Sequence, residues 1–338
     1  MLKYVVKRLL QAIPVLIGLS IVVFLLMRVF SADPAPVVLG EHATREAMDA
    51  WRDAYGLNDP IWKQYIDFLW GALQGNLGES YYTHASVTDE LMARFPATVE
   101  LALVAITIAS LVGITLGVFA AVNKNTAIDG VSMVLSLIGV SMPIFWLGVL
   151  LIILFAGILH VLPSGGRIDP LMQPRGGTGL FLIDTLAKGD TKAFVDALRH
   201  IILPAAALSM YSMAIITRMT RSSMLDTLNE DYVRTARAKG LRKRVVTTHH
   251  ALRNAMLPVS TVIGLQLGSL LGGAMLTETV FAWPGIGKYI VECILKSDFP
   301  VVQGAVLLIG VIFVTINLIV DLIYVWLDPR IKYSKEEG

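Results

Sequence analysis

Two short stretches carry residue types that could bind nucleotide phosphates or a metal ion. In the stretch PGIGKYI a glycine precedes Lys288, as it does in phosphate-binding loops. Ala282 occupies the place of the first glycine, however, and Tyr289 replaces the required serine or threonine. His249 and His250 are adjacent, so they cannot share one helix face as zinc-binding histidine pairs do. With no GxSxG elbow either, the sequence predicts no catalytic residues, no metal site and no cofactor bound by this chain.

A third stretch, EDYVRTARAKGL at residues 230–241, concentrates charge in a chain that is otherwise apolar. Acids at its start suit the positive end of a helix, and bases near its end suit the negative end. Gly240 supplies the left-handed residue that often ends a helix. A helix of about ten residues is marginal in water unless it packs against a partner. The acids are Glu230 and Asp231, and the bases are Arg234, Arg237 and Lys239.

Two kinds of partner fit this short helix. Its basic residues could approach the anionic inner leaflet of a membrane. Alternatively, Tyr232, Val233 and Ala236 could insert into a groove of a cytoplasmic protein. The apolar face is small and rich in alanine, not in tryptophan or leucine, which favours the protein partner. Composition alone leaves both partners open.

The elements that must position this stretch are membrane-spanning helices. The chain of 338 residues is 55% hydrophobic and 16% charged, and its mean hydropathy is +0.66, as in polytopic membrane proteins. Apolar runs long enough to cross roughly 30 Å of hydrocarbon occur at 9–30, 97–122, 131–162, 201–219, 257–275 and 301–327. The third run contains Pro143, and its first part is too short to cross alone. We therefore expect six spans, the third being one tilted or kinked helix.

The distribution of charge predicts which loops face the cytoplasm. Residues 218–253 contain nine basic residues against three acidic ones, an excess typical of short cytoplasmic loops. Six spans then place this loop, the basic N-terminus and the tail at residues 328–338 on the cytoplasmic side of the cell membrane. The net charge of only +2 does not indicate a nucleic-acid binder.

The region after the first span, residues 31–96, is long enough to form a small extracytoplasmic helical domain. The stretch NDPIWKQYIDFLWGAL predicts one helix, because Asp59 can cap it and Pro60 suits its first turn. An earlier helix is predicted at about residues 44–55. The tryptophans and tyrosines here suit a packed core, an interfacial belt or a docking surface. The predicted division is 1–30, 31–96, 97–327 with a cytoplasmic loop at 220–253, and 328–338.

Polar residues within the predicted spans are candidates for function, because charge in a bilayer is costly. Gln266 lies among glycines at four-residue spacing, which permits close helix packing, and it could line a pore or bond a neighbouring helix. Ser141, Met142 and Pro143, at the bend of the third run, are further pore candidates. Most of the others lie near span ends, where a local partner suffices. These others are Arg28, Glu100, Asn317 and Asp321.

Several motifs together resemble one family of transporters. The loop MTRSSMLDTLNEDYVRTARAKGL is followed by HHALRNAMLP, and the chain also contains RFPATVELAL, SMPIFWLG and LTETVFAWPGIGKYIVECILKSDFP. Together they resemble the permeases of ABC importers, specifically the dipeptide, oligopeptide and nickel branch. Residues 234–236 stand where the superfamily has EAA, and Leu257 and Pro258 fall later than its general pattern. The variant RTARAKG is typical of the peptide branch, so this departure favours that branch.

The resemblance implies an all-α membrane protein with six transmembrane helices in the type I ABC importer (MetI-like) fold. It implies a coupling helix that docks on separate ATPase subunits, either two identical ones or a heterodimeric pair, which would bind ATP and Mg²⁺. It also implies a homologous second permease subunit in a heterodimer, and an extracytoplasmic substrate-binding protein that delivers dipeptides or short oligopeptides. The implied coupling residues are Glu230, Asp231, Tyr232, Val233, Arg234, Ala236, Arg237 and Gly240.

Three alternatives stay open at the level of sequence. A related permease could carry nickel or glutathione. An ion-coupled secondary transporter would show mid-span ionisable residues and broken helices in two repeats, and neither is apparent. A membrane scaffold that transports nothing is the third.

Overall fold

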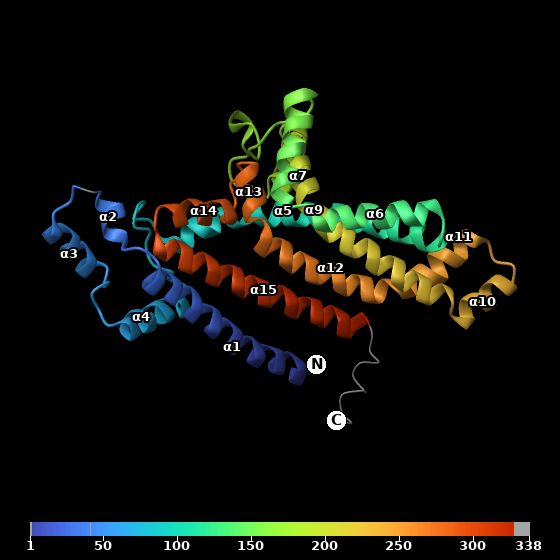
Figure 1. The fold of residues 1–338 in the computed structure, drawn as a ribbon, viewed down its shortest axis with the longest axis horizontal. Coiled ribbons are helices and arrows are strands. Elements are labelled where there is room, and N and C mark those ends of the chain that lie inside the picture. The colour runs from blue at the N-terminus through green and yellow to red at the C-terminus, as the bar shows by residue number, and fades with distance from the viewer. Residues whose placement is uncertain (1, 41, 328–338) are drawn as a thin grey trace.

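The structure, a computed structural model, describes residues 2–40 and 42–327, so the predicted tail at 328–338 lies outside it. Every regular element of the described residues is a helix. Figure 1 shows an elongated bundle whose long helices run roughly along its long axis. The longest are α1 (Leu2–Leu25), which continues as a π-helical turn η1 (Leu26–Phe30), α5 (Val87–Val122), α9 (Thr191–Leu228), α12 (Arg253–Gly273) and α15 (Phe299–Leu327).

The described residues contain five helices that are long and apolar enough to cross a membrane, or six if one bent pair counts as a span. The bent pair is α6 (Ala127–Ser141) and α7 (Ile144–Leu151), which continues as the π-helical segment η2 (Ile152–Ile158). The two parts meet at 104°. Figure 1 shows α7 running across the long axis of the bundle, whereas α6 lies along it.

The prediction of a single tilted or kinked helix for the third apolar run is therefore wrong. Met142, between α6 and α7, is extended, with φ −82° and ψ 125°. The reason is steric, because the ring of a proline disfavours the helical region for the residue before it. Pro143 then precedes the first turn of α7, where its missing N–H costs nothing.

The region after the first span contains α2 (Pro34–Leu39), α3 (Arg45–Ala54) and α4 (Ile61–Leu73). We call residues 31–86 the outer segment. Both predicted helices are present, although Pro60 and not Asp59 lies at the N-cap of α4. Its aromatic residues divide between core and surface: Trp51 packs on the Tyr81 ring at 5.0 Å between centroids, whereas Trp62 and Trp70 are 67% and 65% exposed.

The centre of the bundle is the contact between α5 and α9. Gly117 permits their close approach, since a Cβ there would lie 2.6 Å from Thr220 Cβ and 2.7 Å from the backbone oxygen of Thr217. Nearer the start of α5, a hydrophobic core contains buried side chains from α5, α9 and α12. Trp283 belongs to this core. Its side chain is buried, and its Nε1 donates to the backbone oxygen of Ala97 at 2.9 Å.

Shorter helices lie at both ends of the bundle. Figure 1 places α2 to α4 at one end of the long axis and α10 and α11 at the other. Helix α1 begins and α15 ends toward the α10 end of the bundle. The remaining elements are η3 (Pro170–Met172), α8 (Phe181–Ala187), α10 (Asp231–Ala238), α11 (Lys243–Val245), η4 (Val246–Leu252), α13 (Met275–Val280) and α14 (Ile286–Leu295).

Candidate functional site

Helix α10 contains the charged stretch that the sequence singles out. It follows α9 directly, and α11 and η4 connect it to α12. Glu230 is its N-cap residue, and Gly240 lies just beyond its end with φ +75°, the left-handed conformation that the sequence predicts. The helix has eight residues, close to the ten expected. It is thus a short rigid element between two long helices.

The apolar face of α10 packs against its own chain. Val233 is fully buried and Ala236 is 6% exposed, and both contact Val246 of η4, with Leu228 at the end of α9 beside them. Residues three apart share one helix face, so both side chains turn inward together. The prediction that Val233 and Ala236 insert into the groove of another protein is therefore wrong. They attach α10 to the bundle.

The opposite face of α10 is exposed and charged. Arg234 forms an ion pair with Asp231 at 3.3 Å, and both side chains are largely in solvent. Tyr232 is 42% exposed, and its hydroxyl accepts a hydrogen bond from Asn254 Nδ2 at 2.7 Å. Glu230, Arg237 and Gly240 are also exposed. The surface that α10 offers to another molecule is therefore polar.

A partly buried ion pair lies at the same end of the bundle. Arg221 of α9 donates from Nε to Asp129 Oδ1 at 2.6 Å and from Nη2 to Asp129 Oδ2 at 2.8 Å. Asp129 is 5% exposed and also accepts from the backbone N–H of Asn125 at 3.0 Å. The pair joins the start of α6 to the last turns of α9. Sequence reasoning counted Arg221 among the basic loop residues and missed its partner, 92 positions away.

The predicted pore residues do not come together. Gln266 lies in α12, half-buried, and its Oε1 accepts from Ser212 of α9 at 3.0 Å. Of the two roles expected for Gln266, the structure therefore shows the hydrogen bond to a neighbouring helix. Ser141 and Pro143 are exposed at the break between α6 and α7, and Met142 is half-buried.

The glycines of α12 pack against α15, as their spacing predicts. A Cβ at Gly264 would lie 2.5 Å from the side chain of Val320, and one at Gly268 would lie 3.4 Å from that of Phe313. Glu100, one of the polar residues near the span ends, has hydrogen-bond partners within the chain. Glu100 receives two hydrogen bonds from Arg167, the shorter at 2.6 Å, and one from the backbone of Leu182 at 2.7 Å. The side chain of Asp321 lies outside the described part of the structure.

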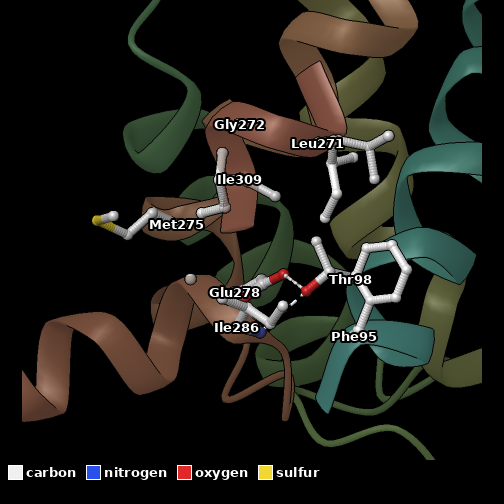
Figure 2. Close-up of a pocket in the computed structure, with 11 residues that line it drawn as sticks. Phe95, Thr98, Leu271, Gly272, Met275, Glu278, Ile286 and Ile309 are labelled. Carbon is white, nitrogen blue, oxygen red and sulfur yellow. Dashed lines mark hydrogen bonds between the residues drawn. The ribbon is translucent and has the colours of Figure 1, made fainter. Parts of the chain in front are cut away.

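The resemblance of PGIGKYI to a phosphate-binding loop has a structural explanation. The backbone N–H of Lys288 donates to Glu278 Oε2 at 2.9 Å, so a carboxylate of the chain occupies the place of a phosphate. Thr98 donates to Glu278 Oε1 at 2.7 Å and accepts from the backbone N–H of Ile286, as Figure 2 shows. Burial raises the pKa of Glu278, and the bonds from Thr98 and from two backbone N–H groups oppose that rise. This site is structural.

Beside Glu278 lies a small apolar pocket between α5, α12 and α15, lined by side chains that include Phe95, Leu271 and Ile309 (Figure 2). Its volume of about 10 Å³ is close to that of one water position. The bundle is therefore closely packed here. Nowhere in the described residues do three or more histidine, cysteine, aspartate or glutamate side chains gather as a metal site would need.

Comparisons with known proteins agree with the motifs. The model of the binding-protein-dependent transport system inner membrane component family matches residues 113–333, and the model of its N-terminal region matches residues 1–102. The chain is 46% identical to the dipeptide transport system permease protein DppB of Alkalihalophilus pseudofirmus, over 98% of this chain and all of that protein. It is 44% identical to DppB of Escherichia coli K12 and 46% identical to the di/tripeptide permease DppB of Pseudomonas aeruginosa. In both cases 99% of this chain and all of the relative are covered.

A family match over more than half of the chain and full-length relatives above 40% identity agree with the helical bundle and its apolar spans. The chain therefore belongs to the family of binding-protein-dependent transport system inner membrane components.

Proposed function

We propose that this chain is a transmembrane permease subunit of an ATP-driven importer for dipeptides or short oligopeptides. The names of its full-length relatives support this substrate class over nickel or glutathione. A non-catalytic role also agrees with Glu278 filling the place where a phosphate would bind. ATP and Mg²⁺ belong, in this proposal, to two separate ATPase subunits.

The single observation that supports ATP coupling most directly is the division of α10 into two faces. Val233 and Ala236 fasten the helix to α9 and η4, so a force applied to α10 passes into the bundle. The exposed residues Asp231, Arg234 and Arg237 remain free to contact an ATPase through polar bonds. Closure of the ATPases would then move α9 and α12 together.

Helix α7 supports pairing with a homologous second permease. It projects across the long axis in Figure 1, and its residues Phe145 and Trp146 are 46% and 47% exposed, with Ile153 of η2 at 51%. The pocket between α5, α12 and α15 holds about one water, so it is too small to pass a peptide. We infer a heterodimer in which the pathway lies between the two permeases.

The same proposal places the α10 end in the cytoplasm, with both termini. The outer segment and the loops that contain α8, α13 and α14 would then face the extracytoplasmic binding protein. The basic residues near α10 support this orientation, because short cytoplasmic loops carry such an excess.

The proposal is tested by reconstituting this chain with its partner subunits in lipid vesicles and measuring dipeptide uptake. Uptake should require ATP, the ATPases and the binding protein, and competing dipeptides should reduce it more than nickel or glutathione does. Arg237→Glu should weaken ATPase association without lowering the melting temperature, because Arg237 is exposed. Arg175→Glu, the same change at another exposed arginine in the loop before α8, is the matched control and should leave ATPase association intact. Uptake by this chain alone on an ion gradient would refute the proposal.

A further inference from the structure

Helix α4 of the outer segment exposes a row of four large apolar side chains. They recur three or four positions apart, which places them on one face of the helix. Their exposed fractions run from 54% to 74%. We call them the α4 stripe: Trp62, Ile66, Trp70 and Leu73. An apolar face of this kind is unfavourable in water and marks a surface that another apolar phase or molecule covers.

The contact between α4 and α1 fixes the height of α4 relative to the membrane. The Tyr65 ring packs edge-on against the Phe24 ring at 5.3 Å between centroids, and the Phe68 ring stacks on Phe24 at 6.2 Å. A hydrogen bond of 2.9 Å joins the Tyr65 hydroxyl to Ser20 Oγ. The apolar span that contains Ser20 and Phe24 ends at Phe30. At 1.5 Å per residue the two α1 residues lie roughly 9–15 Å inside that end, and Figure 1 shows α4 beside it.

The same stretch of α1 presents apolar side chains to its surroundings. Four of its residues are 38–55% exposed, namely Ile21, Val22, Leu25 and Leu26. Exposed apolar residues of a membrane span face lipid or another membrane protein, since water does not reach that depth. The α4 stripe lies at the height of this surface. A soluble partner would have to displace lipid to cover it, so the occupant belongs to the membrane.

The charged residues of α4 lie on a different face from the stripe. Lys63 and Asp67 are one turn apart and exposed, and Lys63 Nζ donates to Asp59 Oδ2 at 2.8 Å. A helix with one charged face and one apolar face that contains tryptophan is typical of helices that lie in the plane of a membrane interface. Tryptophan itself favours the headgroup level. The side chains of α4 therefore divide as an interfacial helix requires.

The composition of the α4 stripe favours lipid over a second membrane helix. Contacts between membrane helices are enriched in glycine, alanine, serine and threonine, which permit close approach. The stripe contains two tryptophans, one isoleucine and one leucine. Large, apolar and interfacial side chains of this kind are typical of contact with lipid.

We propose that α4 is an interfacial helix of the membrane, with the α4 stripe inserted among the lipids that surround the outer end of the first span. The outer segment is then held against the bilayer surface by lipid as well as by its contacts with α1. The proposal uses only α4 and the first span, so it does not rest on the transport role proposed above.

Spin labels measure which phase surrounds α4 in lipid bilayers. Labels are attached to Trp62→Cys and Ile66→Cys, and to Asp67→Cys as the matched control on the charged face of the same helix. The native Cys293 is only 3% exposed, and labelled wild type gives its background. Oxygen concentrates in hydrocarbon and a charged nickel chelate in water. The ratio of oxygen to nickel accessibility should be about threefold or more higher at the two stripe positions than at the control.

The other outcomes of this measurement overturn the proposal. High nickel accessibility at the stripe would show that it faces water, and low accessibility to both reagents would show that a protein covers it. The measurement is repeated after addition of the partner subunits and the binding protein. The ratio should stay unchanged, whereas a loss of oxygen accessibility would identify a protein occupant.

Tryptophan fluorescence tests the same contact without a label. Bromine on lipid acyl chains quenches tryptophans that lie near the hydrocarbon. The double variant Trp62→Phe, Trp70→Phe keeps an apolar face, so it should fold normally and lose part of the quenched emission. Trp51→Phe is the control and should raise the quenched fraction, because Trp51 packs on Tyr81 within the outer segment. A quenched fraction that does not fall in the double variant would place α4 outside the bilayer and overturn the proposal.

Discussion

Asp129 and Arg221 form an ion pair with two hydrogen bonds, at N–O distances of 2.6 and 2.8 Å, that joins the start of α6 to the last turns of α9. Asp129→Asn and Arg221→Met should each lower the melting temperature, because each change leaves the charge of the remaining partner without an opposite charge beside it. A double-mutant cycle should give a coupling energy of about 0.5–3 kcal/mol. Additive effects of the two changes would show that the pair contributes nothing to stability.

The buried face of α10 predicts a contrast between two valines. Val233→Ala should destabilise the protein by about 1–3 kcal/mol, because Val233 is fully buried against η4. Val245→Ala is the control, since Val245 is 40% exposed and should change stability by less than about 0.5 kcal/mol. Thermal unfolding in detergent measures both. Equal melting temperatures of the two variants would contradict the packing of α10 described above.

The packing of α5 on α9 predicts a contrast between two glycines. Gly117→Ala places a Cβ 2.6 Å from Thr220 and should cost about 1–3 kcal/mol, because two backbones must separate. Gly130→Ala, in α6, meets no atom within 4 Å and should be neutral or stabilising by up to about 1 kcal/mol. Melting temperatures of the two variants measure the contrast. A neutral Gly117→Ala would mean that α5 and α9 are not in close contact there.

The burial of Asp298, at the base of the outer segment, predicts that the stability of the protein depends on pH. Its carboxylate accepts from Ser80 Oγ at 2.6 Å and from the backbone N–H of Tyr81 at 3.1 Å, and burial raises its pKa above the ordinary value. A raised pKa means that the folded state holds the proton more tightly than the unfolded state. The contribution of protonated Asp298 to the free energy of unfolding is therefore complete below the ordinary aspartate pKa. It is lost as the pH rises through the raised pKa of Asp298 in the folded protein.

The Asp298→Asn variant isolates this effect from other titrating groups. Wild-type stability minus variant stability should fall as the pH rises from about 4, the ordinary aspartate value, through the raised pKa. Melting temperatures of both proteins across this range measure the difference. A difference that grows with pH would show that the hydrogen bonds from Ser80 and Tyr81 outweigh burial and lower the pKa instead.

Local signals in the sequence predict much of this fold. Apolar runs of sufficient length indicate the long spans, and the charge order with Gly240 indicates α10 and its end. The glycine spacing of α12 indicates close packing against another helix, and the structure shows that this helix is α15. Each of these depends on residues close together in the chain. Pro143 is also a local signal, and it predicts that the helix is interrupted there. It does not predict the 104° angle between α6 and α7, because that angle depends on the packing of neighbouring helices.

The partners of buried polar residues could not be predicted. Glu100 and Arg167 are 67 positions apart, and Glu278 and Thr98 are 180 apart. Such pairs depend on which helices become neighbours, which no spacing rule specifies. The same limit explains the error over Val233 and Ala236. Their apolar face indicates that α10 packs on something, and only the fold shows that this something is η4 and the end of α9.

The composition of α9 after Pro204 gives it mechanical stiffness. Residues 205–228 contain neither glycine nor proline, and at 1.5 Å per residue they form a rod about 36 Å long, more than the ~30 Å of a hydrocarbon core. Proline is the usual point of flexure in a helix, so any hinge in α9 lies at Pro204, beyond this rod. In the proposed transport cycle, a tilt of α10 by a few degrees would therefore become a sideways displacement at the Pro204 end of this rod, with little of the movement lost to bending.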